Sequence, residues 1–295
     1  MRVGDGGRGA LGAATAMFCV GTLTGVSPAL HGYPVYGGQA VRYLVGAVLL
    51  LVVAQVVGGG LLRPTRREAV FLFLLAATGL TAFNVLIVES TRFADPATVG
   101  TVVAAVPIVL ALVGPAVERR KPAPRVLMAA VVVVVGVAVT SGFGGGTPLG
   151  LLLAFGALAC EAGFSLLALP VLGRLGAIRV SAYSAALAVP QLAVVGLVVD
   201  GADVVRVPTV PEALALAYLA VVVTVFAFLC WYASLPRLGA DRAGLFSGFL
   251  PIGAIVSGVL LGTGHPGLVD LFGVGLVLVG LAIGLRPARA EVGVR

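Results

Sequence analysis

Three charged side chains fall inside long apolar runs of the sequence: Arg42, Glu89 and Glu161. A charge near the centre of a membrane helix costs about 2.5–3.5 kcal/mol on insertion scales, so each of these residues needs a chemical reason to be there. Arg42 and Glu89 are expected at similar depth on adjacent helices, where an ion pair would offset the cost of both charges. Two interpretations of such a pair are open: a structural contact, or a gate or binding site for a zwitterion.

Glu161 differs from the other two because it lies near the middle of its apolar run, with no basic residue at comparable depth. An unpaired carboxyl there is expected to be protonated, because burial removes the solvation of the charged form. One interpretation is that Glu161 exchanges a proton for a substrate cation. The other is a neutral acid that forms a hydrogen bond with a neighbouring helix.

Further polar and aromatic side chains in these runs are candidates for the lining of a substrate cavity, although most such residues hold helices together or anchor them at an interface. Two prolines, Pro107 and Pro251, each remove a backbone hydrogen bond in mid-run and are expected to kink a helix beside the cavity. The candidate cavity residues are Gln39, Asn84, Tyr183, Gln191, Trp231, Tyr232 and Ser247.

Motifs for other chemistry are missing from the sequence. An intramembrane serine protease would need Gly-x-Ser and a histidine within a run, yet Ser247 has the wrong spacing from Gly244, and His31 and His265 lie outside the runs. Clustered metal ligands and a Walker-type loop are also absent. The sequence therefore predicts that the protein is not an enzyme and needs no metal or cofactor.

These residues must be positioned by membrane-spanning helices. The 295 residues are 60% hydrophobic and 11% charged, whereas soluble domains carry about 25% charged residues. Each helix needs roughly 20 apolar residues to cross the hydrocarbon, and isolated strands would leave backbone groups unpaired there. The sequence predicts an all-α integral membrane protein with ten transmembrane helices, near 10–30, 36–58, 68–88, 96–117, 124–142, 149–170, 179–199, 212–234, 241–262 and 267–285.

Basic residues are distributed unevenly between the two sides of this predicted bundle. Of the 19 lysines and arginines, Arg42 lies within a span and only Arg92 and Arg206 fall on the second side. Because basic loops stay in the cytoplasm, this asymmetry predicts a multi-pass protein of the cytoplasmic (plasma) membrane with both termini cytoplasmic. It also accounts for the net charge of +7 without a nucleic-acid partner.

Short matches between the two halves indicate an internal duplication. Val106-Pro107-Ile108 corresponds to Leu250-Pro251-Ile252, and Val135-Gly136 corresponds to Val279-Gly280, in both cases 144 residues later. Five helices are an odd number, so the second copy must start on the opposite side of the membrane. Residues 1–145 and 146–295 are therefore predicted to form two inverted five-helix repeats, a construction that recurs in secondary transporters.

Motifs in each half follow one plan. Arg42-Tyr43-Leu44 opens the second predicted span, and Thr91-Arg92-Phe93-Ala94, Pro107 and Val117-Glu118-Arg119 follow in order. The second half continues with Tyr232-Ala233-Ser234-Leu235, Arg237-Leu238-Gly239-Ala240, Leu250-Pro251 and Leu271-Phe272-Gly273. Over nearly the whole chain this order resembles the EamA-type unit of the drug/metabolite transporter (DMT) superfamily. Val20 and Glu161 stand where each half of that family often has Trp, so no substrate is carried over.

The resemblance implies a secondary transporter that works by alternating access and exports small metabolites, amino acids or drugs, with proton coupling at Glu161 as one of the two interpretations of that residue. Two alternatives within transport are a lipid-carrier flippase and an uncoupled facilitator. From other classes, an intramembrane enzyme and a non-transporting membrane scaffold are the competing hypotheses. The expected partners are a small-molecule substrate and membrane lipid, and the glycine spacings Gly258/Gly262 and Gly280/Gly284 suit either a monomer or a homodimer.

Overall fold

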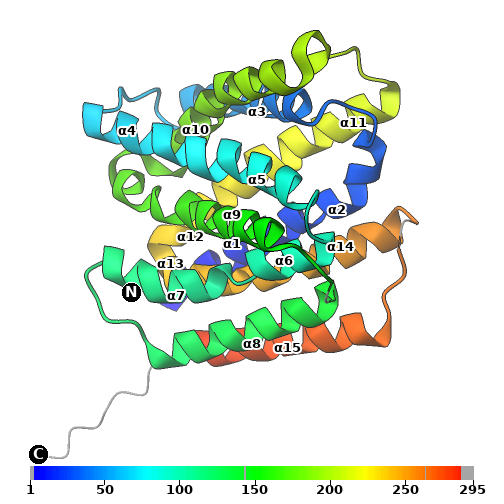
Figure 1. Ribbon diagram of the computed structural model, residues 1–295. Coiled ribbons are helices and arrows are strands. Elements are labelled where there is room, and N and C mark those ends of the chain that lie inside the picture. Colours follow the sequence, from blue (N-terminus) through cyan, green and yellow to red (C-terminus); the bar gives the residue numbers. More distant parts are fainter. Residues whose placement is uncertain (1–2, 143, 263, 287–295) are drawn as a thin grey trace, which may run out of the picture.

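The computed structural model describes residues 3–142, 144–262 and 264–286. Within these ranges ten helical segments are long and apolar enough to span a membrane, which confirms the predicted all-α membrane fold (Figure 1). The first five comprise α1 (Val3–Gly21) with α2 (Leu23–Val26) and η1 (Ser27–Leu30); α3 (Val35–Val56); α4 (Arg66–Leu75) with η2 (Ala76–Ala82) and α5 (Phe83–Ser90); α6 (Pro96–Val103) with α7 (Val106–Val117); and α8 (Pro124–Ser141).

The second five spans repeat this order of elements. They comprise α9 (Pro148–Leu166); α10 (Leu169–Asp200), followed by η3 (Gly201–Val204); α11 (Val210–Tyr218) with η4 (Leu219–Phe226) and α12 (Ala227–Leu238); α13 (Ala240–Gly244) with η5 (Leu245–Gly248) and α14 (Phe249–Leu260); and α15 (Leu268–Leu285).

α10 consists of two helices that meet at a kink at Gly176, so the seventh span begins close to the predicted residue 179. Residues 169–175 form a short helix before this kink, where Gly176 has a φ of 73°, a left-handed conformation that favours glycine. Arg174 and Arg179 flank the kink and bind groups in the loop between α3 and α4 and in the first turn of α4. Arg179 Nε donates to the carbonyl of Gly60 at 2.9 Å.

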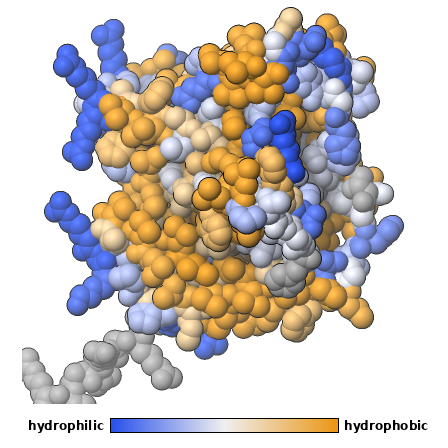
Figure 2. Space-filling model, in the orientation of Figure 1, coloured by the Kyte–Doolittle hydropathy of each residue, from blue (hydrophilic) through white to orange (hydrophobic). Residues whose placement is uncertain are grey.

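Basic side chains gather at one end of the bundle, which we call the arginine-rich end. Figure 2 shows hydrophilic side chains projecting from it and a broad hydrophobic surface across the middle of the spans. The other end, called the opposite end, is formed by the segments 31–34, 91–95, 144–147, 201–209 and 264–267. The arginine-rich end contains Arg8, Arg63, Arg66, Arg67, Arg119, Arg120, Lys121, Arg125, Arg174, Arg179, Arg237, Arg242 and Arg286.

Irregular features of the helices recur 144 residues apart. Thr65 and Glu68 form a capping box at the start of the third span, and Thr209 and Glu212 form one at the start of the eighth. Each of these two spans then contains a wider π-helical stretch, η2 and η4 respectively. The local defects of the first half are thus repeated in the second, as expected for duplicated units.

Helix packing follows the same symmetry. Equivalent helices pair with each other, α8 with α15 and α3 with α10, and Figure 1 shows α8 and α15 side by side along one edge. The first span packs on the eighth and ninth spans through α1, α12 and α14, and its counterpart α9 packs on the third and fourth spans through α5, α6 and α7. The two halves are therefore packed together as two inverted five-helix repeats.

Glycines allow α8 and α15 to approach closely. A Cβ atom at Gly273 would lie 2.6 Å from the carbonyl oxygen of Gly136, and one at Gly280 would lie 3.0 Å from the carbonyl oxygen of Ala129. A backbone oxygen cannot move aside as a side chain can. Gly280 and Gly284 are therefore used for packing within the bundle.

We expect Gly273→Val to destabilise the protein by about 1–3 kcal/mol, because the added carbons would separate α8 from α15. Gly275→Val on the same helix is the matched control, since a Cβ there would meet no atom within 4 Å. Thermal unfolding in detergent measures the difference. Equal unfolding temperatures for the two variants would contradict the packing argument.

Candidate functional site

Side chains from both halves enclose a cavity of about 130 Å³ near the middle of the spans, called the central cavity. Its walls come from α1 and α3, the third and eighth spans, and α9. The lining is mostly apolar and aromatic, with a few polar groups: Ala16, Met17, Val20, Leu23, Arg42, Tyr43, Gly79, Leu80, Phe83, Asn84, Glu161, Phe164, Val223, Ala227, Phe228 and Trp231.

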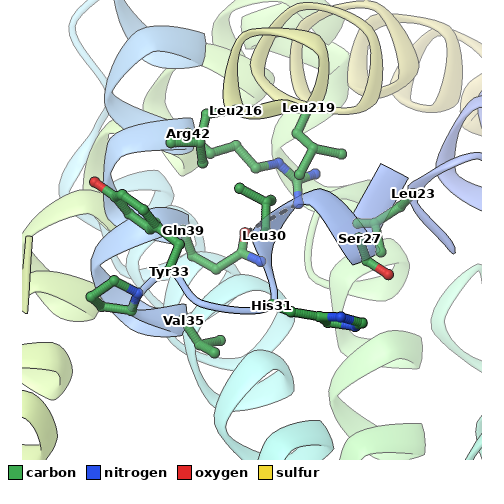
Figure 3. A pocket seen from close by; sticks show the side chains of 12 residues that line it. Leu23, Ser27, Leu30, His31, Tyr33, Val35, Gln39, Arg42, Leu216 and Leu219 are labelled. Carbon is green, nitrogen blue, oxygen red and sulfur yellow. Dashed lines mark hydrogen bonds between the residues drawn. The ribbon is translucent and has the colours of Figure 1, made fainter. Parts of the chain in front are cut away.

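A first vestibule of about 260 Å³ adjoins the central cavity and shares Leu23 and Arg42 with it. It extends to the opposite end, where His31 and Val35 are exposed. Figure 3 shows that the side chains of Arg42 and Gln39 extend into it from α3. The wall is otherwise mostly apolar.

A second vestibule of about 520 Å³ adjoins the central cavity through Val20, Phe83 and Glu161. It lies between the fourth and ninth spans and reaches Pro96 and Asp270 at the opposite end. Both vestibules therefore lead from the central cavity to the same end of the bundle.

Glu161 lies on α9, where the central cavity and the second vestibule meet. The helix begins after Thr147, whose hydroxyl accepts a hydrogen bond from the backbone amide of Gly150 at 3.2 Å. Among the described residues, the Glu161 carboxyl has no hydrogen-bond or ion-pair partner. It is half-buried and faces space large enough for a small ligand.

Arg42 is 6% exposed and is held by neutral groups. Its Nε donates to the Thr224 hydroxyl at 2.8 Å, and one Nη donates to the Gln39 side-chain oxygen at 3.1 Å. The expected pair with Glu89 is not formed. Glu89 instead lies 3.3 Å from Arg92, one turn further along the chain, where both side chains reach the opposite end.

Three of the seven other predicted cavity residues line these spaces. Asn84 and Trp231 line the central cavity, and Gln39 lines the first vestibule. Trp231 is oriented by a hydrogen bond from its indole nitrogen to the Ser165 hydroxyl at 3.2 Å.

The other four predicted residues lie elsewhere. The Tyr183 hydroxyl donates to the carbonyl of Leu62 at the arginine-rich end. Gln191 accepts a hydrogen bond from Thr81 at 2.8 Å, so it joins the third span to the seventh. The remaining two, Tyr232 and Ser247, are buried and absent from the cavity walls.

Both candidate prolines follow a break in their span. Pro107 is in the first turn of α7, just after the interruption between α6 and α7, and Pro251 is in the first turn of α14, after the 3₁₀ segment η5. Their lack of an amide hydrogen costs little in a first turn. Pro251 lines the second vestibule, whereas Pro107 is buried.

The arginine-rich end is closed beneath the central cavity. The rings of Phe164, Phe228 and Tyr232 pack together, with 5.1 Å between the centroids of Phe164 and each of the other two. At the ends of α7 and α13, Arg120 donates to both carboxyl oxygens of Asp241 at 2.9 and 2.5 Å. These hydrogen bonds raise the pKa of the Arg120 guanidinium above its ordinary value.

The sequence prediction did not include the packing of the Phe164, Phe228 and Tyr232 rings or the Arg120–Asp241 pair. The charges of the pair were visible, but they lie 121 residues apart and meet only because α7 packs on α13. The described residues contain no group of three or more His, Cys, Asp or Glu side chains that could hold a metal. The charged side chains that line the central cavity are those of Glu161 and Arg42.

Comparisons with known proteins agree with this architecture. The model of the EamA-like transporter family matches twice, at residues 7–142 and 148–286. The chain is 26% identical over 257 residues to the uncharacterized transporter YetK of Bacillus subtilis (strain 168), covering 84% of this chain and 78% of that one. A protein of known crystal structure, 19% identical, superposes with a TM-score of 0.78 over 94% of this chain and 97% of that chain, which shows the shared fold. The chain belongs to the EamA-like transporter family, and it is a membrane transporter by that membership.

Proposed function

We propose that the protein is a secondary transporter of small molecules that works by alternating access and couples transport to proton movement at Glu161. The observation that carries the proposal is the Glu161 carboxyl, which has no partner among the described residues and lies where the central cavity meets a vestibule. A carboxyl that alternates between two aqueous sides can bind a proton on one side and release it on the other.

Alternating access is supported by the fourth and ninth spans. At the opposite end α6 and α14 line the second vestibule, whereas at the arginine-rich end α7 and α13 pack directly together. Both spans are interrupted between these halves. Rocking about the two breaks would close the vestibule and open the arginine-rich end.

The proposed orientation follows from the basic residues. With the arginine-rich end in the cytoplasm, both termini are cytoplasmic and both vestibules face outward across the plasma membrane. A proton that enters from outside would neutralise Glu161 and release the cationic group of a bound substrate. After the change of access, loss of this proton to the cytoplasm would allow the next substrate to bind, so an inward proton gradient would drive export.

Proteoliposomes that contain a pH-sensitive dye test this proposal. A panel of amino acids, small amines and cationic drugs is added under an imposed pH gradient, with protein-free liposomes as the control. We expect at least one compound to move protons only when the protein is present. Transport without proton movement would favour an uncoupled facilitator, and no transport of any compound would favour a scaffold.

A further inference from the structure

Arg42 carries a positive charge that the surrounding protein orients but does not neutralise. A guanidinium has five N–H donors. Two of them bind Thr224 and Gln39, and in the described part of the chain the other three have no acceptor. No carboxylate of the described residues lies within ion-pair distance of Arg42.

This arrangement is unusual for a side chain that is 6% exposed. Buried charges are normally paired, because desolvation without a counter-charge is costly. The ring of Tyr43, whose centroid lies 5.1 Å from the guanidinium carbon, provides a cation–π contact but no negative charge. A neutral side chain could join α3 to Thr224 without this cost, so a purely structural role does not explain the charge.

The position of Arg42 indicates what the charge is for. Its side chain lines both the central cavity and the first vestibule, and Figure 3 shows it extending into this space beside Gln39. We propose that Arg42 is an anion-binding residue that binds the single carboxylate of a small substrate with an apolar body. This inference rests on the proposed function, since it identifies the substrate class of the same cavity.

A carboxylate fits this site better than a phosphate. The planar guanidinium matches the two oxygens of a carboxylate, and the linings of the central cavity and first vestibule contain no lysine and no second arginine. A phosphate monoester carries about −1.5 to −2 charges at pH 7. It would leave negative charge uncompensated in a cavity that also contains Glu161.

The walls around Arg42 define the rest of the ligand. Leu23, Leu30, Leu216 and Leu219 line the first vestibule, and aromatic rings line the central cavity. The two adjoining spaces, about 260 and 130 Å³, together lie near the lower end of the roughly 300–1,000 Å³ typical of pockets for drug-sized ligands. Together these features favour a compact aliphatic or aromatic acid. The proton exchange at Glu161 requires a cationic group, such as an ammonium, on the transported substrate, whereas the contact with Arg42 requires only the carboxylate.

Isovalerate and isovaleramide test the proposal, because they share one apolar body and differ in the carboxylate. Binding to the purified full-length protein is measured by calorimetry. We expect the acid to bind roughly 10- to 100-fold more tightly than the amide, as charge-assisted bidentate hydrogen bonds imply. Arg42→Gln should abolish this preference. Arg92→Gln, which removes an exposed arginine at the opposite end, should retain it.

Thr224→Val provides a second test if Arg42→Gln does not fold, because it keeps the charge and removes only the group that orients it. This variant should reduce the preference for the acid several-fold. The proposal would be overturned if isovalerate did not bind, or if the acid and the amide bound equally. It would also be overturned if the preference for the acid were unchanged in Arg42→Gln. Where that variant does not fold, an unchanged preference in Thr224→Val would have the same consequence.

This binding experiment, combined with the proteoliposome assay, separates this inference from the proposed function. Proton-coupled transport combined with a preference for the acid that does not depend on Arg42 would refute the inference alone. Binding of the acid that depends on Arg42, without transport of any compound, would refute the proposed function alone.

Discussion

Glu161→Gln is expected to reduce accumulation driven by a pH gradient to the level of protein-free liposomes. Glutamine has nearly the same shape as glutamic acid but cannot release or bind a proton in this range. The carboxyl has no partner among the described residues, so the substitution breaks no contact within them that holds the helices. Exchange of labelled for unlabelled substrate across the membrane should continue, since it needs the change of access but no net proton movement.

Glu89→Gln is the matched control for this variant. Glu89 is also a glutamate in a predicted span, but its side chain is 31% exposed at the opposite end and pairs with Arg92. Accumulation should survive this substitution. If Glu161→Gln also accumulated substrate against its gradient, the carboxyl would be a structural neutral acid and the uncoupled facilitator would be the better hypothesis.

The spans and their inversion could be predicted from the sequence because the signals are local or periodic. Apolar length, flanking prolines such as Pro96 and Pro124, and the 144-residue offset between Pro107 and Pro251 do not depend on how helices pack. The seventh span was predicted close to its start after the Gly176 kink, whereas the short helix over residues 169–175 before the kink was not predicted. Arginines near a helix end can reach polar groups at the interface, as Arg179 does with Gly60.

The site was less predictable because it depends on how each helix is rotated about its axis. Depth alone suggested a pair between Arg42 and Glu89, whereas the competing partner Arg92 lies three residues from Glu89 on the same helix end. Similarly, Gln191 and Tyr183 have the polarity of cavity residues but face Thr81 and the Leu62 carbonyl. Composition identifies such residues, and only tertiary packing decides which of them meet the cavity.

The second large effect, a shift in the equilibrium between the closed and open states of the arginine-rich end, is expected from breaking the Arg120–Asp241 pair. Asp241 is 3% exposed and Arg120 38% in their side chains, so the pair lies between a buried ion pair, worth about 3–5 kcal/mol when broken, and a surface pair worth about 0–1. We therefore expect the Asp241→Asn variant to destabilise the closed arginine-rich end by about 2 kcal/mol. Asparagine keeps the size of the side chain and removes its charge.

This pair has no equivalent at the opposite end. The positions related by the repeat are Ala97 for Asp241 and Gly264 for Arg120, and neither carries a charge. The pair therefore stabilises only the state that is closed at the arginine-rich end. A loss of about 2 kcal/mol should shift the equilibrium roughly 30-fold toward the state open at that end.

Spin labels at Val117 and Arg242, with the native cysteines replaced, measure the separation of α7 and α13 directly. Asp241→Asn should add a longer distance to the distribution, and the double exchange Arg120→Asp with Asp241→Arg should restore the short one. Glu118→Gln is the control, because Glu118 binds Arg120 without reaching the Asp241 carboxylate, and a glutamine keeps an oxygen that can accept from the Ala240 amide as Glu118 does. An unchanged distribution in Asp241→Asn would mean that apolar packing, such as that of Gly114 against Ala240, holds this end closed without the ion pair.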